Sequence, residues 1–378
     1  MKKVLFKKLL SDYLGFFFIT LVSTSVVIWV FQAVNYLDIM IEDGRDYLVY
    51  VNFSLLNFPK IISKVYPFAL FFILFYVTTK SEFNNELIIL WNFGVHKIEI
   101  VNFFLKISII LLIFQILFTS ILVPIAQDTA RSFLRSSTIN FFDNFIKPQK
   151  FNDTIKGVTI YSETKDKNGN LKNLYLKKDV GNGFQITYAK KGEFRQIANK
   201  PILVLFDGAT ITSINNNITN IAFSKSDFSL SNIETNTTTY KKTQEISSSK
   251  LIRCTTNFYK LKKEEFILEG KNIENCSYKN IQNILRELYK RFIIPFYIPL
   301  LSLIPLILIT SSKENSNYNK LRLITFLIGL GVIIFSETTI RLISNILVYD
   351  AGMAIIPFIM TLFFYLFLFN KFHVKIKL

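Results

Sequence analysis

Side chains that could carry out acid–base or metal chemistry are scarce in this sequence. The two histidines are His96 and His373, and neither lies near a nucleophile or a group of metal-ligating residues. Gly329-Leu-Gly331 lies inside an apolar stretch and lacks the lysine with which a phosphate-binding loop holds ATP. The sequence therefore predicts no catalytic site, no metal and no cofactor. If the protein moves a substrate uphill, we expect another subunit to hydrolyse the nucleotide.

Four charged residues interrupt stretches that are otherwise apolar. Lys60 and Lys64 are four residues apart, so a helix would present both on one face. They could extend to lipid headgroups, or they could bind the phosphates of a bound lipid. Glu337 and Arg341 have the same spacing, with the acid first, and an ion pair would lower the cost of burying either. A structural pair is favoured over a substrate site.

Residues 81–95 have the pattern of a short amphipathic helix between two apolar stretches. Glu86 lies in its first turns, where a carboxylate suits the helix dipole, and Gly94 could cap its C-terminus. A short helix of this kind is how an ATPase subunit grips a membrane partner. Ordinary helix capping explains the same residues, so both interpretations stay open.

The elements that must position these residues follow from apolar composition. The chain has 378 residues, of which 51% are hydrophobic and 39 are phenylalanine. A bilayer core needs about 20 apolar residues per helix because it offers the backbone no water. The uncharged runs are 13–37, 65–79, 107–127, 292–312, 323–336 and 351–370. With the second extended back toward Leu55 and the fifth on toward Val348, these runs predict six transmembrane helices. The first is expected to be a retained anchor.

Lysine and arginine in the short loops indicate the orientation. They gather in the N-terminal residues, in loops 80–98 and 312–322, and in the C-terminal tail, whereas the alternate short loops hold only Arg45 and Arg341. Both termini are therefore expected in the cytoplasm, with residues 128–288 in the periplasm. The outer segment has an excess of lysine and arginine over acidic residues, which favours an anionic substrate or simply solubility. The cytoplasmic loops are too short to read nucleic acid.

The outer segment reads as β-structure. Alternating patterns predict strands at 158–162, 171–176, 184–188, 201–206, 209–214 and 218–223, and Asn-Gly, Asp207-Gly208 and similar pairs between them predict hairpin turns. We expect an antiparallel sandwich or jelly roll, with a helix near 125–146 before it and a mostly helical return near 256–290. The predicted domains are 1–127, 128–288 and 289–378. Cys254 and Cys276 fall in this segment, where a disulfide is chemically possible.

The whole layout resembles the YjgP/YjgQ family, the lipopolysaccharide export permeases LptF and LptG. The resemblance is carried by residues 29–38 (Trp-Val-Phe-Gln-Ala-Val-Asn-Tyr-Leu-Asp) with Gly44, by the Asn85-to-Gly94 stretch, and by Tyr289-Lys-Arg291 with Pro295. The stretch around Gln32, Asp38 and Gly44 is closer to LptF. Family members often have alanines where this chain has Trp91-Asn92-Phe93, and the first helix lacks the intramembrane basic residues of some members.

This resemblance implies a permease that extracts lipopolysaccharide from the inner membrane and passes it to a periplasmic bridge. The implied partners are an LptG-like sister permease, an LptB-like ATPase dimer and LptC/LptA-like bridge proteins. Helices one and five would form the lateral gate. The expected ATPase-coupling residues are Glu82, Glu86, Leu87, Trp91 and Gly94, and the candidate phosphate contacts are Arg45, Lys60 and Lys64. The alternative is a mechanotransmitting ABC partner that exports no lipid. A sensor would need a cytoplasmic signalling domain.

Overall fold

The computed structural model describes residues 2–41, 47–136, 146–155, 158–166, 169–180, 183–197, 200–214, 217–229, 241–260 and 273–373. The chain divides into two compact units, which are described separately. The helical unit comprises Met1–Trp29, Asn57–Asp128 and Lys241–Leu378, and the sheet unit comprises Val30–Leu56 and Thr129–Tyr240. The segment 241–288, which was expected in the outer domain, is thus part of the helical unit.

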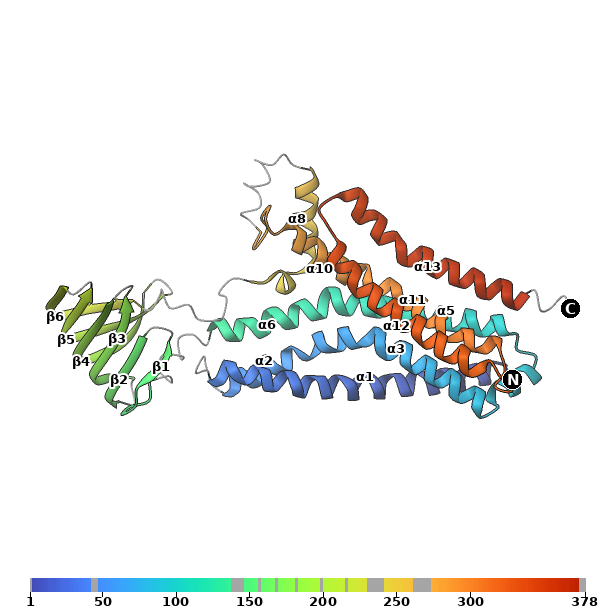
Figure 1. The fold of residues 1–378 in the computed structure, drawn as a ribbon, viewed down its shortest axis with the longest axis horizontal. Coiled ribbons are helices and arrows are strands. Elements are labelled where there is room, and N and C mark those ends of the chain that lie inside the picture. Colours follow the sequence, from blue (N-terminus) through green and yellow to red (C-terminus); the bar gives the residue numbers. More distant parts are fainter. Residues whose placement is uncertain are drawn as a thin grey trace. The chain divides into compact units, whose positions relative to one another are not determined.

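Six stretches of the described chain are helical and apolar enough to cross a membrane, as predicted. They are built from α1 (Lys2–Ile41), α2 and α3 (Tyr47–Leu56, Phe58–Phe83), α5, η1 and α6 (Lys97–Leu117, Phe118–Leu122, Val123–Ser136), α10, η3, α11 and η4 (Ile281–Phe292, Ile294–Phe296, Tyr297–Leu303, Ile304–Thr310), α12 (Tyr318–Leu342) and α13 (Leu347–His373) (Figure 1). Shorter elements are α4 (Glu86–Asn92), η2 (Thr243–Glu245) and α8 (Ser248–Lys260).

The fourth membrane stretch is the core of the helical unit. Every residue of α11 and η4 is buried, and α11 packs against α3, α5, α12 and α13. Pro295, Pro299 and Pro305 lie in this stretch, and the helix alternates there between α and 3₁₀ geometry. Proline removes a backbone donor and clashes with the preceding turn, which explains the interruptions. The three prolines therefore interrupt a helix that its neighbours enclose.

Helix α3 lies between α1 and α12. On one side the Phe17 ring of α1 meets Tyr66 edge-on, with ring centroids 5.2 Å apart. On the other side Phe326 of α12 packs on Phe72, with centroids 5.7 Å apart. Gly329 of α12 faces the ring of Phe71 so closely that any Cβ would overlap it. The glycine therefore allows the close packing of α12 against α3.

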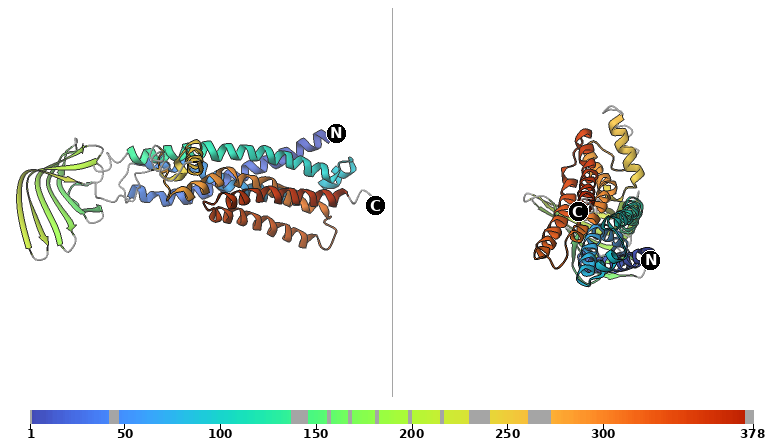
Figure 2. Two further views of the ribbon diagram at one scale, coloured as in Figure 1. Left: turned by 90° about the horizontal axis from the view of Figure 1, so that it is seen from above. Right: turned by 90° about the vertical axis from the view of Figure 1, so that its right-hand side faces the viewer.

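The sheet unit holds six antiparallel strands in chain order: β1 (Asn152–Ile155), β2 (Val158–Lys165), β3 (Leu171–Val180), β4 (Gly183–Ile197), β5 (Lys200–Ile214) and β6 (Asn217–Ser229). The predicted inserted all-β domain is confirmed. A sandwich or jelly roll has two sheets, whereas the described strands form one. This sheet curves along its strands, and its buried side chains, among them Ile160, Leu176 and Leu205, form one apolar cluster (Figure 2).

The pair Asp207-Gly208 does not form the hairpin turn that its residue types predict. Strand β5 runs straight through it, although Asp207 does have a positive φ of 50°. Asn173 in β3 has a φ of 49°, and Leu171 and Leu174 on either side of it are both buried although they are three residues apart. The inward face thus changes parity there, although the pairing of β3 with β2 and β4 keeps one register. Asp207-Gly208 therefore lies within a continuous strand and does not end it.

A disulfide joins Cys254 of α8 to Cys276, with their Cα atoms 6.0 Å apart. The bond that the sequence left as a possibility is therefore formed. It lies in a small apolar cluster with Ile246, Leu251 and Ile284. The cluster holds α8 against α10, so the bond closes a two-helix layer of the helical unit.

Candidate functional site

The short helix α4 begins directly after a tight turn at the end of α3. Asn85 has a positive φ of 62°, which separates the two helices. Glu86 is the first residue of α4, and its Oε2 accepts a hydrogen bond from the Ser81 hydroxyl at 2.8 Å. This carboxylate lies where the backbone N–H groups of a helix are unpaired, so it stabilises the start of α4.

The end of α4 is a Schellman cap. Gly94 has a φ of +72° and donates its N–H to the Trp91 carbonyl at 2.9 Å, while the Val95 N–H bonds to the Leu90 carbonyl at 3.1 Å. Leu90 and Val95 also belong to the same apolar core. These are the paired hydrogen bonds and the apolar contact of that motif. The capping role predicted for Gly94 is therefore confirmed.

The two faces of α4 differ in exposure. Leu87 is 4% exposed, and Trp91 is half-buried against the same core. The opposite face presents Ile88, Ile89 and Phe93, which are 44%, 49% and 44% exposed. Two of the expected coupling residues thus point inward, and the outward apolar face was missed. The spacing of Leu87 and Leu90 could have revealed it, because it places residues 88 and 89 on the other side.

Glu82 lies in α3 rather than α4, and its side chain is buried. Its Oε1 accepts a hydrogen bond from the Lys313 backbone N–H at 2.9 Å. From the start of α5, the Lys97 ammonium donates to the Ile309 carbonyl in η4 at 2.7 Å. The segments on both sides of α4 are therefore fastened to the same end of the buried fourth stretch.

Lys60 and Lys64 lie at the other end of α3. Lys60 is half-buried and donates to the Gln244 side-chain oxygen at 3.2 Å, whereas Lys64 is exposed. The charges that act on Lys60 are those of Lys64, Lys242 and Lys290, opposed by Glu287. These four lysines, here called the lysine cluster, place an excess of positive charge at one end of α3. Arg45, the third candidate, lies outside the described residues.

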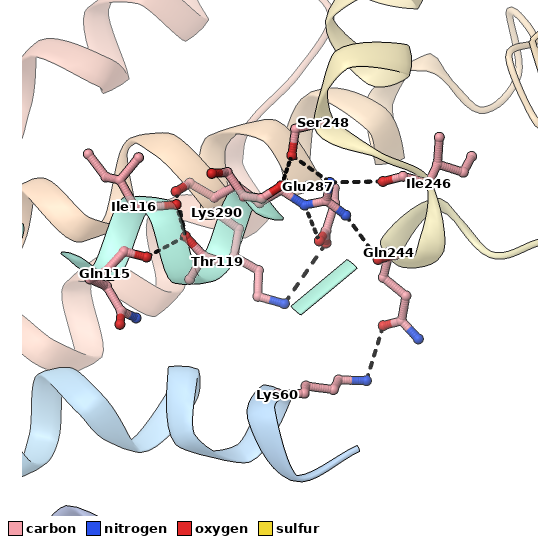
Figure 3. Close-up of polar contacts among 11 residues, drawn as sticks. Lys60, Gln115, Ile116, Thr119, Gln244, Ile246, Ser248, Glu287 and Lys290 are labelled. Atoms are coloured by element: carbon pink, nitrogen blue, oxygen red, sulfur yellow. Dashed lines mark hydrogen bonds and ion pairs between the residues drawn. The ribbon is translucent and has the colours of Figure 1, made fainter. Parts of the chain in front are cut away.

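Arg291 organises the neighbourhood of Lys60, and sequence reasoning gave it no role. It is 2% exposed. Its guanidinium donates to Glu287 Oε1 at 3.0 Å, to the Ile246 carbonyl at 2.9 Å, to Ser248 Oγ at 3.0 Å and to the Gln244 carbonyl at 2.9 Å (Figure 3). A buried charge is tolerated when it is paired and hydrogen-bonded in this way. Arg291 thus fixes the turn whose Gln244 side chain holds Lys60.

The partners of Glu287 and Lys241 show which charges are already engaged. Glu287 pairs with Arg291 at 3.0 Å and with Lys290 at 3.9 Å, so one carboxylate faces several cations in this neighbourhood. Lys241 pairs with Asp128 at 3.0 Å, and this hydrogen bond raises the pKa of the Lys241 ammonium above its ordinary value. Lys241 is therefore an internal partner, whereas the lysine cluster keeps a net positive charge.

Glu337 and Arg341 both lie in α12, as expected, but no ion pair joins them in the described structure. Both side chains are exposed on the surface of the isolated chain, and the Arg341 carbonyl accepts a hydrogen bond from Arg286 at 3.0 Å. The expected intrahelical pair is thus not formed. Within the described ranges no three His, Cys, Asp or Glu side chains are grouped so that they could hold a metal ion.

Comparison with known protein families agrees with this fold. The family model described as "Lipopolysaccharide export system permease LptF/LptG" matches residues 7–371, nearly the whole chain. None of the curated proteins matches at a significant level. Permeases of this family are non-catalytic membrane subunits of the Lpt transporter, in which LptB is the ATPase. With its six membrane helices and inserted antiparallel sheet, the chain belongs to the LptF/LptG family of lipopolysaccharide export permeases.

Proposed function

We propose that this permease is of the LptF type and that it works with an LptG-like sister permease, an LptB-like ATPase dimer and an LptC/LptA-like bridge. The distribution of lysine and arginine supports an orientation with both termini in the cytoplasm and the sheet unit in the periplasm. The stretch around Gln32 supports the LptF type. In this orientation α4 faces the cytoplasm, and Lys60 lies near the periplasmic surface.

The lysine cluster is the observation that supports an anionic substrate. Lys64 is exposed, and Lys60 donates a hydrogen bond to a neutral amide oxygen instead of a carboxylate, so both side chains are available to an incoming anion. Ammonium groups form short, strong hydrogen bonds with phosphate oxygens. We infer that Lys60, Lys64 and Arg45 meet the phosphates of lipopolysaccharide as it leaves the outer leaflet of the inner membrane.

The apolar faces of α1 and α12 support a lateral gate. Residues such as Ile19 and Val27 in α1 and Leu327 and Ile334 in α12 are more than half exposed in the isolated chain. Because α3 separates the two helices, the faces cannot close on one another within this chain. In the proposed heterodimer each faces a helix of the sister permease, and acyl chains pass between them. Burial of each acyl-chain methylene is favourable by about 0.8 kcal/mol of free energy, so expelling the acyl chains requires work from the ATPase.

The route for that work runs through the buried fourth stretch. Glu82 and Lys97 fasten the surroundings of α4 to its cytoplasmic end, and Arg291 fastens its other end to the turn that holds Lys60. A continuous series of packed and hydrogen-bonded elements therefore links the proposed ATPase contact to the proposed phosphate contact. Coupling between distant sites requires such a physical connection, and its existence is tested by mutation. Glu82 acts in this route as an internal strut, while Ile88, Ile89 and Phe93 contact the ATPase.

A mechanotransmitting partner that exports no lipid would share α4 and the sheet. The net positive charge of the lysine cluster favours the exporter, since mechanical transmission alone does not require it. The deciding experiment purifies the tagged chain from inner membranes in detergent and quantifies its proteins and lipids by mass spectrometry. The exporter should bring a second permease, an ATPase and lipopolysaccharide.

In the same preparation, the double variant Lys60→Gln/Lys64→Gln should retain about tenfold less lipopolysaccharide, a loss of about 1.4 kcal/mol. Lys80→Gln is the matched control, because Lys80 lies at the opposite end of α3. Unchanged retention in the double variant removes these lysines from the site. Recovery of an ATPase with no lipopolysaccharide in the parent chain supports mechanotransmission instead.

A further inference from the structure

A second feature of the helical unit shares no residue with the lysine cluster. It is an apolar groove of about 570 Å³ between α5 and α13, with Phe296 and Pro299 of the buried fourth stretch beneath it. This volume lies within the range of about 300–1,000 Å³ that is usual for sites of small ligands. Leu105, Ile109 and Leu112 form one wall, and Phe358 and Leu362 form the other. On each wall these residues recur at three- and four-residue spacing, which is one face of a helix.

The groove has defined ends. At one end the Tyr365 hydroxyl of α13 donates to Asn102 Oδ1 of α5 at 3.0 Å, which bridges the two walls. At the other end the rings of Phe296 and Phe358 meet with centroids 4.4 Å apart. The space between is therefore a slot that could hold a single narrow apolar chain.

The lining of this slot includes the cationic side chain of Lys106. Lys106 lines the groove one helical turn beyond Asn102, and its side chain is exposed. It lies roughly 14 Å along α5 from the start of that helix, at 1.5 Å per residue. In the described part of the chain Lys106 has no hydrogen bond, ion pair or ring contact. A lysine within a membrane helix is costly to leave without a partner, so such residues commonly pair with another group.

We propose that the groove binds an anionic phospholipid, with one acyl chain in the slot and the phosphate at Lys106. The apolar walls suit the chain, and the unpaired ammonium supplies the complementary charge. Asn102, four residues before Lys106, places its amide on the same face and could donate a second hydrogen bond. Lys106 lies toward the α4 end of the helices, so with the proposed orientation the lipid belongs to the cytoplasmic leaflet. It is thus distinct from lipopolysaccharide in the outer leaflet.

The test uses the full chain in its purified complex, reconstituted into phosphatidylcholine vesicles. A small fraction of phosphatidylglycerol carries a photoreactive acyl chain, and labelled residues are identified by mass spectrometry. We expect Ile109, Leu112 and Leu362 to be labelled above Ile110 and Leu117, which are 67% and 53% exposed on α5 but do not line the groove. Photoreactive phosphatidylcholine should label the groove less.

Lys106→Gln should lower groove labelling by roughly fivefold, which corresponds to about 1 kcal/mol. Lys80→Gln should leave it unchanged. Leu362→Trp, which fills the slot while keeping Lys106, should also lower it. Equal labelling of groove and control residues, or labelling by both lipids that ignores Lys106→Gln, overturns the proposal. Crosslinks from the groove to another protein chain in place of lipid would also overturn it.

Discussion

The Glu82 carboxylate accepts a hydrogen bond from the backbone nitrogen of Lys313 at 2.9 Å, although the two residues are far apart in the chain. The Lys313 ammonium in turn donates to the Phe83 carbonyl at 3.0 Å. These two bonds tie the last turn of α3 to the segment between η4 and α12. Helix α4 follows α3 after two residues. A displacement of α4 should therefore also move the end of the buried fourth stretch.

Replacing Glu82 by alanine should lower stability and weaken coupling. The Lys313 N–H loses its acceptor, and such a loss costs about 1–3 kcal/mol. Glu82→Gln keeps a side-chain oxygen and should behave nearly as the parent chain. The measurements are the melting temperature of the purified complex and the lipopolysaccharide released per ATP hydrolysed. An alanine variant that matches the parent in both would show that this bond transmits nothing.

The outward face of α4 should decide binding of the ATPase. Ile89→Lys replaces an exposed apolar side chain by a charged one. It should therefore abolish co-purification of the ATPase while leaving the melting temperature unchanged. Leu87→Lys is the contrasting variant, since burying a charge in the core should unfold the protein first. Continued recovery of the ATPase with Ile89→Lys would place the contact elsewhere.

Local features of this chain were predictable because local chemistry dictates them. A bilayer forces long apolar helices, and Gly94 caps α4 because it alone among its neighbours adopts a positive φ without strain. The disulfide could be named only as a possibility, since pairing depends on geometry that spacing does not give.

Features that depend on distant partners were not predictable. Arg291 bonds to the carbonyls of Gln244 and Ile246, more than forty residues earlier in the chain, and no periodicity encodes that meeting. Asp207 does adopt the positive φ that its type favours, but only the neighbouring strands decide that it bends β5 instead of ending it. Glu337 and Arg341 have the spacing of a helical pair, yet α12 leaves both exposed in the isolated chain.

The pair Lys241–Asp128 should give a pH-dependent contribution to stability. Because the hydrogen bond to Asp128 raises the pKa of Lys241, the folded state holds this proton more tightly than the unfolded state. The contribution is therefore fully present below the unfolded pKa of about 10.4 and is lost as pH rises through the higher folded value. Lys241→Met should thus lower the melting temperature at pH 8, and the difference should shrink toward pH 11. Lys250→Met, at an exposed lysine, should show no such trend.

The disulfide should stabilise the layer of α8 and α10. It closes a loop with a sequence separation of 22 residues, for which chain entropy predicts about 3 kcal/mol. Cys254→Ser and the double variant Cys254→Ser/Cys276→Ser should lower the melting temperature equally, because either breaks the same bond. Reduction of the parent protein should reproduce that shift. A free thiol detected in unreduced, folded protein would contradict the pairing.

Arg291 should be the most sensitive residue of the site. Arg291→Met leaves the Glu287 carboxylate without its main partner and should cost about 3–5 kcal/mol, whereas Arg291→Met/Glu287→Gln removes both charges and should recover part of that loss. Melting temperatures of the four members of this cycle measure the coupling.

The same cycle separates stability from substrate contact. Arg291 fixes the turn that carries Gln244, so Arg291→Met should also lower lipopolysaccharide retention although Lys60 and Lys64 are intact. If the double variant regains its melting temperature but not its lipopolysaccharide, the position of Gln244 controls the lysine cluster. If retention follows the melting temperature throughout, Arg291 is a folding residue alone, and Lys60 does not depend on the turn that it contacts.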